Sequence, residues 1–284
     1  MILRIEDIDS SRVRPGMAEL AMTDLRWIGL DWDEGPDIGG PASPYYQSMR
    51  IDRYAEALDI LKKAELVYPC SCTRSDIQRV ASAPHLGEEG LIYPGTCSGR
   101  SVSDADNLAD RMYAWRFRVD RSPVSWNDLF RGLICASTGS CVGDFIVWRS
   151  DGIPSYQLAT VVDDAAMGVT QVIRGDDLIS STPRQLVLYQ ALGLKPPRFG
   201  HVPLVIGQDG RRLAKRNESI KLQTLRKAGI SPKRILSWIG RSIGCDIKES
   251  EQTSDLIGHF RADNLSPHPV VFDPVMIGFS PGAD

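Results

Sequence analysis

The chain has 284 residues, which is enough to bury a sizeable hydrophobic core in one or two domains. No apolar run approaches the length that spans a bilayer and no signal peptide is visible, so a soluble cytoplasmic protein is expected. Six cysteines are too few for a disulfide scaffold, so clustered cysteines are interpreted as metal ligands or as chance free thiols.

The first third of the sequence alternates strand-like and helical patterns. Residues 2–8 are typical of a buried strand with a polar end at Glu6, Asp7 and Asp9. An amphipathic helix is predicted at 17–29 and a second helix at 47–64, because apolar residues recur on one face of each. The Gly/Pro-rich stretch between them, residues 35–44, is predicted to be a loop.

A less regular segment with several short strands is predicted from residue 68 to about 143. The sheet is expected to resume at 145–148, followed by two apolar, strand-like runs at 156–164 and 172–178. From Gly210 onward the pattern is basic and largely helical, and the tail after Asp263 is expected to be irregular.

Each of the two strand-like runs ends in a polar cluster, and the second leads directly into a predicted helix start. Thr182 is a candidate N-cap, Pro183 would take the first helical position, Gln185 would complete a capping box, and Gly193 marks the end. Such convergence of strand ends and a helix start builds ligand sites in open α/β sheets. Arg174 and Asp176 are expected in the turn between strand and helix, and the alternative for this turn is ordinary ion pairing at a sheet edge.

Three of the six cysteines, Cys70, Cys72 and Cys97, fall within 28 residues of sequence. Thiolates are preferred zinc ligands, and a closed tetrahedral site needs a fourth donor. His85 is the commoner chemical choice for that donor. The alternative is a set of free, partly buried thiols.

Several ordered motifs together resemble the class I glutamyl-tRNA synthetases, and within them the short paralogues called glutamyl-Q tRNA(Asp) synthetases. They are Leu3-Arg-Ile-Glu-Asp-Ile-Asp9, Gly29-Leu-Asp-Trp-Asp-Glu-Gly35, Cys70-Ser-Cys72, Asp144-Phe-Ile, residues 156–185 and the region around Lys215. The resemblance implies an α/β fold with a class I aminoacyl-tRNA synthetase Rossmann-like parallel sheet, a zinc-binding insertion and a short helical C-terminal region. The implied division is a first catalytic half at 1–62, the insertion at 63–143, a second half at 144–208 and a basic helical region at 209–284 without an anticodon-binding domain.

The same resemblance assigns roles to individual residues. Glu6, Tyr156 and Arg174 would bind glutamate, with Arg174 clamping a carboxylate through its planar fork of donors. Cys70-x-Cys72 followed by Tyr93-x-x-x-Cys97 follows the pattern of the short paralogues, which nominates Tyr93 rather than His85 as the fourth ligand of a structural zinc.

The ATP site of the family includes a mobile loop with the KMSKS motif. Arg212-Leu-Ala-Lys-Arg216 matches this motif with Ala214 in place of the serine. Arg212, Lys215 and Arg216 would bind ATP, with Lys215 meeting the charge that develops on the phosphates in the presence of Mg²⁺.

In the resembled family, a strand and a helix carrying the HIGH motif precede the Arg-Ile-Glu-Asp strand. Met1 stands immediately before that strand here, so a chain that starts at Met1 is expected to lack the motif and to lose much of its activity. Pro84-His85-Leu86-Gly87 resembles HIGH faintly, but it lies between the cysteine motifs and is not interpreted as catalytic.

Residues 195–241 hold twelve Lys and Arg against the two acids Asp209 and Glu218, a local charge of +10 on a remainder of −13. This basic block indicates a phosphate-bearing partner, whereas its structural alternative is a solvated helical face. The resemblance implies a monomer that activates glutamate with ATP and transfers it to queuosine of tRNA(Asp). A truncated synthetase charging the tRNA 3′ end and an inactive tRNA-binding protein are the alternatives.

Overall fold

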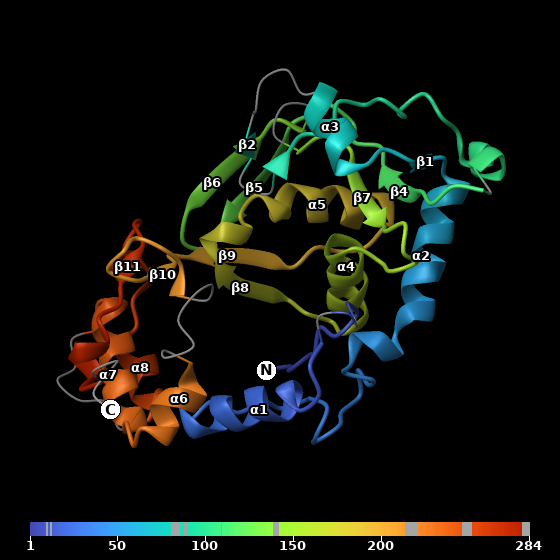
Figure 1. Cartoon of the computed structure of the whole chain (residues 1–284). Helices are drawn as coiled ribbons and strands as arrows, with labels where there is room; N and C mark the ends of the chain where they lie inside the picture. The colour runs from blue at the N-terminus through green and yellow to red at the C-terminus, as the bar shows by residue number, and fades with distance from the viewer. Residues whose placement is uncertain are drawn as a thin grey trace. The chain divides into compact units, whose positions relative to one another are not determined.

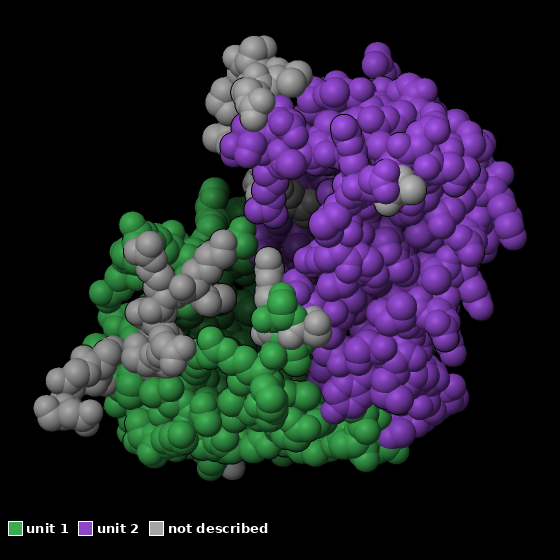
Figure 2. Space-filling model, turned by 45° about the vertical axis from the view of Figure 1, so that its right-hand side comes forward, with its two compact units in different colours: residues 1–3, 11–38, 202–284 green, residues 4–10, 39–201 purple. Residues whose placement is uncertain are grey.

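The computed structural model describes residues 1–9, 11, 13–80, 86–87, 90–108, 110–138, 142–213, 221–245 and 252–279. The chain divides into two compact units, coloured separately in Figure 2. Unit 1 comprises Met1–Leu3, Ser11–Ile38 and Val202–Asp284, and unit 2 comprises Arg4–Ser10 and Gly39–His201.

Unit 2 holds most of the strands (Figure 1). In chain order its α-helices and strands are α2 (Ile51–Lys63), β1 (Val67–Cys70), α3 (Arg74–Val80), β2 (Leu86–Gly87), β3 (Gly90–Leu91), β4 (Ala114–Phe117), β5 (Val124–Asp128), β6 (Gly132–Ala136), β7 (Phe145–Trp148), α4 (Tyr156–Ala166), β8 (Gln171–Gly175), α5 (Ser181–Ala191) and β9 (Arg198–Val202). Strand β4 lies between β1 and β7 and pairs antiparallel with both, whereas β5 pairs with β6 and β8 with β9. The core under these elements contains the fully buried side chains Leu61, Val67, Val147, Leu158 and Leu188.

The parallel sheet predicted from the resemblance is only fragmentary among the described residues. The predicted strand at 2–8 is half-buried and makes single parallel bridges, Ile2 with Glu34 and Ile5 with Tyr46. Its backbone bonds go to two different segments, with Leu3 N donating to Glu34 O and Ile5 N to Tyr45 O, so no continuous ladder forms.

The run at 156–164 is helix α4, so its prediction as a strand was wrong. Ser155 caps the helix through a side chain that accepts a hydrogen bond from Leu158 N. The helix is buried on nearly all sides from Gln157 to Asp164, and its polar residues Gln157, Thr160, Asp163 and Asp164 are buried together with its apolar ones. Polarity therefore did not mark a solvent-facing side in the sequence.

Helix α5 begins at Ser181, one residue before the predicted N-cap, and ends before Gly193, which adopts the positive φ of 66° that favours glycine. The predicted capping box does not form, because the side chains of Thr182 and Gln185 both accept hydrogen bonds from Arg174 instead. The predicted strand at 145–148 is β7 as expected. The predicted run at 172–178 is a strand only as far as Gly175, in β8, and its last residues, Asp176–Leu178, form a 3-10 helix.

Unit 1 contains α1 (Met17–Trp27), β10 (Val205–Ile206), α6 (Leu222–Lys227), α7 (Pro232–Ser242), α8 (Thr253–His259) and β11 (Val270–Val271). The tail after Asp263 is more ordered than predicted, because β11 pairs parallel with β10 and Phe272 packs edge-on against Trp238 with ring centroids 4.8 Å apart. Ile277 is fully buried in the same core. Among the described helices of both units, none is long and apolar enough to cross a membrane.

Candidate active site and metal centre

Arg174, near the end of β8, is the best-anchored of the predicted site residues. Its Nε donates to His201 Nε2 at 3.1 Å, its Nη1 to Gln185 Oε1 at 2.9 Å and its Nη2 to Thr182 Oγ1 at 2.8 Å. The guanidinium also lies over the Phe199 ring, 5.1 Å from its centroid. Three acceptors on three nitrogens fix the plane of the guanidinium, which is the geometry that bidentate carboxylate recognition requires.

Glu6 lies in the same unit and is linked to Asp164 of α4 through Arg4. Arg4 donates to Glu6 Oε1 at 3.2 Å and to Asp164 Oδ1 at 2.7 Å. Burial favours the neutral form of Arg4, but these carboxylates outweigh it and raise its pKa above the ordinary value. Burial also raises the pKa of Asp164, and the Arg4 charge only partly offsets the effect.

Behind Arg4 lies Asp163, a fully buried carboxylate on α4. It accepts hydrogen bonds from Gln47 Nε2 at 2.8 Å, Arg50 Nε at 2.5 Å and Tyr54 Oη at 2.7 Å. Three donors satisfy the oxygens of this buried carboxylate, and the hydrogen bond from Tyr54 ties α2 to α4. Arg4 Nε lies 3.7 Å from the same carboxylate, so Arg4 borders a network that connects the two helices.

Tyr156 is 40% exposed and sits at the start of α4. Burial of its hydroxyl raises its pKa, Arg174 opposes this shift, and Glu6 adds to it. These two charges act on the tyrosine from the predicted glutamate site, so unit 2 brings all three predicted glutamate-binding residues into one electrostatic neighbourhood. Tyr189 of α5 adds a buried hydroxyl that finds no hydrogen-bond partner among the described residues.

The cysteine cluster also assembles as predicted. The Sγ atoms of Cys70, Cys72 and Cys97 all lie within 4.8 Å of one another, with Cys72 and Cys97 3.5 Å apart. The Tyr93 hydroxyl is 3.4 Å from Cys70 Sγ and 3.5 Å from Cys72 Sγ. A tetrahedral zinc with ~2.3 Å bonds to sulfur places its ligand atoms ~3.8 Å apart, so three thiols and a phenol at these separations fit such an ion.

Arg116 of β4 supports this cluster from behind. Its Nε donates to Cys70 Sγ at 3.2 Å, and its guanidinium stacks on the Tyr93 ring at 3.8 Å. Burial would raise the pKa of Cys70, but its hydrogen bonds with Tyr93 and Arg116 outweigh burial and hold that pKa below the ordinary value. In Cys72 burial dominates and raises the pKa to about 11.

The structure does not test some of the predicted site residues. Lys215, Arg216 and His85 lie outside the described residues, so the predicted ATP contacts and the alternative zinc ligand stay predictions. Arg212 is described in unit 1, where it forms an isolated antiparallel β-bridge with Ile206 after the turn at Gly210. Asp176 forms an ion pair with Arg131 at 2.8 Å, which is the structural alternative considered for this turn.

Sequence reasoning missed the roles of four residues at the predicted glutamate site: Arg4, Asp164, Gln185 and His201. Gln185 was noticed, but as a capping residue. Arg4 and Asp164 stand within the quoted motifs, next to residues that were selected, so their charge was the available signal. His201 is one of only four histidines, yet nothing in its sequence neighbourhood indicated a partner.

The family model described as tRNA synthetases class I (E and Q), catalytic domain, matches residues 1–273. The chain belongs to this family. It is 49% identical over 246 residues to the glutamyl-Q tRNA(Asp) synthetase of Nitratidesulfovibrio vulgaris, covering 86% of this chain and 76% of the relative. It is 47% identical over 276 residues to the one from Symbiobacterium thermophilum, covering 95% and 84%.

Longer relatives are similar as well. Glutamate--tRNA ligase 2 of Syntrophus aciditrophicus is 40% identical over 278 residues, and the chain spans 57% of its length. The crystal structure of a glutamate-tRNA synthetase from Elizabethkingia anophelis is similar as well, with a TM-score of 0.80 and 25% sequence identity. The match covers 97% of this chain and 62% of the chain in that structure. The chain is thus a ligase-type, glutamyl-tRNA synthetase-like enzyme with the α/β fold of the class I catalytic domain, and the predicted family is confirmed.

Proposed function

We propose that the protein activates glutamate with ATP and transfers the glutamyl group to queuosine in tRNA(Asp). The observation that carries the amino-acid assignment is the threefold anchoring of Arg174 beside Glu6 and Tyr156. A fixed guanidinium suits a carboxylate, and Glu6 offers a negative charge to the substrate ammonium. This pairing of charges matches the two ends of a glutamate molecule.

For the activation step, Arg212, Lys215 and Arg216 are the proposed ATP ligands. Adenylate formation develops negative charge on the phosphates as pyrophosphate leaves, and cations on a loop can meet that charge together with Mg²⁺. The support is the KMSKS-like sequence and the chain's membership of a family whose catalytic domain it matches.

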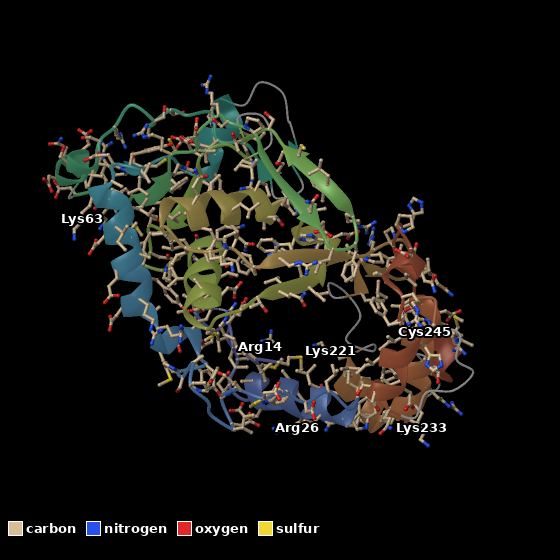
Figure 3. The ribbon with its side chains drawn as sticks, turned by 180° about the vertical axis from the view of Figure 1, so that it is seen from behind. Arg14, Arg26, Lys63, Lys221, Lys233 and Cys245 are labelled. Atoms are coloured by element: carbon tan, nitrogen blue, oxygen red, sulfur yellow. The ribbon has the colours of Figure 1, made fainter. Side chains whose placement is uncertain are left out.

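The proposed acceptor rests on the relatives. Relatives at 45–49% identity carry the name glutamyl-Q tRNA(Asp) synthetase, and the chain covers 74–84% of their lengths. The basic block at 195–241 would meet tRNA phosphates, since Lys and Arg supply most of the affinity for nucleic-acid backbones. Figure 3 shows Lys221 and Lys233, two members of that block, in the C-terminal part of unit 1.

Cys70, Cys72, Tyr93 and Cys97 are the proposed ligands of a structural zinc. When bound, the ion would cross-link β1 to the segment around Cys97 without taking part in the reaction. Metal analysis of the purified protein should find about one zinc per chain, and Cys97→Ala should lose it. Cys245→Ala, in unit 1, is the matched control and should retain the metal. Unchanged zinc in Cys97→Ala would exclude this site.

The decisive assay follows radiolabelled glutamate into tRNA. With ATP and Mg²⁺, we expect glutamate-dependent pyrophosphate exchange and label in the anticodon fragment of queuosine-containing tRNA(Asp). A transcript without queuosine is the matched control and should stay unlabelled. Removing the terminal adenosine of the tRNA should leave the labelling intact.

Charging of the tRNA 3′ end is the second candidate, because the chain is also 40% identical to Glutamate--tRNA ligase 2 of Syntrophus aciditrophicus. It predicts label at the terminal adenosine, equally with and without queuosine. The position of the label therefore distinguishes transfer to queuosine from charging of the 3′ end. Binding of tRNA without any pyrophosphate exchange would contradict both candidate functions.

A further inference from the structure

Behind the glutamate site lies a buried pair of ionisable residues that no step of the proposed reaction uses. Asp128 ends β5, His201 lies in β9, and both side chains are fully buried. His201 Nδ1 is 2.5 Å from Asp128 Oδ2, and its other ring nitrogen accepts the hydrogen bond from Arg174 Nε at 3.1 Å. A continuous chain of hydrogen bonds thus runs from Asp128 to the guanidinium.

The partners of the ring determine its tautomer. Arg174 has only donors, so His201 Nε2 must be an acceptor and the single ring proton must be on Nδ1, where it is donated to Asp128. The Thr182 hydroxyl lies 3.3 Å from the same Nε2 and accepts from Arg174, so it can donate to the histidine. Burial lowers the pKa of His201 and the Arg174 charge lowers it further, which keeps the ring neutral.

Asp128 is equally well held. Burial would raise its pKa, but the bond from His201 and the backbone N–H groups of Phe130 and His201 outweigh burial and lower it. An ionised Asp128 fixes the Nδ1–H tautomer, in the way that a carboxylate fixes the tautomer of a metal-binding or catalytic histidine.

We propose that Asp128 and His201 are positioning residues that aim the Arg174 guanidinium at a carboxylate of glutamate. The inference rests on the proposed role of Arg174 in binding glutamate. An arginine side chain has several rotatable bonds, and ordering it on binding would reduce affinity. The neutral His201 acceptor, with Gln185 and Thr182, orders it beforehand.

Two substitutions of His201 test whether this residue orients Arg174 or only stabilises the fold. In His201→Gln, the side-chain oxygen reaches the place of Nε2 and can accept from Arg174. In His201→Asn, the amide reaches the place of Nδ1 and can donate to Asp128, but no acceptor faces Arg174. Thr138→Val serves as a matched control, since it removes another fully buried hydrogen-bonding side chain of unit 2, bound to Asp120 O and Ser122 O.

Equilibrium dialysis with radiolabelled glutamate and pyrophosphate exchange give the readouts. We expect His201→Asn to weaken glutamate binding roughly 10- to 100-fold, the effect of losing a hydrogen bond to a charged group, with little change in the KM for ATP. His201→Gln should recover most of the affinity, and Thr138→Val should leave the KM for glutamate unchanged. If His201→Asn is insoluble, Thr182→Val removes the neighbouring acceptor of Arg174 and should weaken glutamate binding in the same way.

Equal glutamate affinity in wild type, His201→Gln and His201→Asn would overturn the inference while leaving the proposed function standing. Absence of glutamate binding in the wild type would instead overturn the proposed function, and this inference with it. Nitrogen NMR of the histidine ring gives an independent check, because a proton on Nε2 instead of Nδ1 would contradict the relay even if glutamate binds.

Discussion

Arg174 donates to three acceptors from three different nitrogens, an arrangement that lysine cannot reproduce. Arg174→Lys should therefore raise the KM for glutamate roughly 10- to 100-fold, while the KM for ATP changes little. Pyrophosphate exchange at varied glutamate gives the measurement. Arg184→Lys is the matched control, since the Arg184 guanidinium donates to the backbone oxygens of Ser180 and Val142. An unchanged KM in Arg174→Lys would remove this residue from the glutamate site.

The buried His201 should also make stability depend on pH. Burial and the Arg174 charge lower its folded-state pKa, although Asp128 opposes them, whereas an unfolded chain has a histidine pKa of about 6.5. Below that value the unfolded state takes up a proton that the folded state refuses, so this contribution to stability is present above about pH 6.5 and is lost as the pH falls.

Urea unfolding at about pH 7.5 and about pH 5.5, on either side of the unfolded-state pKa, tests this expectation. The wild type should lose more unfolding free energy on acidification than His201→Gln, which has no group titrating at that position. Carboxylates that do not contact His201 contribute to both proteins and cancel in the comparison. Parallel losses in the two proteins would show that His201 is not the titrating group.

At the scale of secondary structure, the short elements after Asp263 complete the core of unit 1. Ile277 is fully buried there with Leu225, Ile235 and Trp238. Ile277→Ala should lower the unfolding free energy of this unit by about 2–5 kcal/mol, because it leaves a cavity in a packed core. Val275→Ala, at a site 64% exposed, is the control and should cost far less. A similar small effect of both would mean that the tail adds little to the core.

What the sequence could predict at this scale follows from periodicity. Helices α1 and α2 were predicted because each exposes one face, whereas α4 is buried nearly all round and its run of apolar residues looked like a strand. The capping box at Thr182 failed for a different reason. The motif had the correct residue types, but Arg174 offers their oxygens a stronger, charged donor from another element.

The candidate sites also contain some residues that the sequence could predict and others that it could not. Cys70, Cys72 and Cys97 could be predicted because thiols at short spacing have few other uses, and the structure brings them together. The partnership of Asp128, His201 and Arg174 could not, because it joins residues 73 positions and 27 positions apart, and only β8 and β9, which carry Arg174 and His201, pair as strands. Such long-range hydrogen bonds have no local sequence signature.

For the whole molecule, the uneven charge is the property with the clearest consequence. A block with a charge of +10 on a remainder of −13 should bind the tRNA backbone through released counterions, so tRNA affinity should fall steeply with salt. The proposed glutamate site is in unit 2, outside most of this block, so glutamate binding should depend on salt far less. Filter binding of tRNA(Asp) between about 50 and about 300 mM KCl measures the slope of log K against log salt.

Lys233 and Arg241 on α7 test whether the block itself binds the tRNA. Both are exposed members of it, and replacing both with Gln should reduce the magnitude of the salt slope by about 1 for each tRNA phosphate that is left without a cationic partner. Lys63→Gln, at the exposed end of α2 in unit 2, removes a charge outside the block and serves as the control. Because the substituted side chains face solvent, none of these changes should alter the KM for glutamate. If the α7 changes leave the slope unchanged while Lys63→Gln lowers it, the tRNA binds outside the basic block, and the charge asymmetry has another purpose.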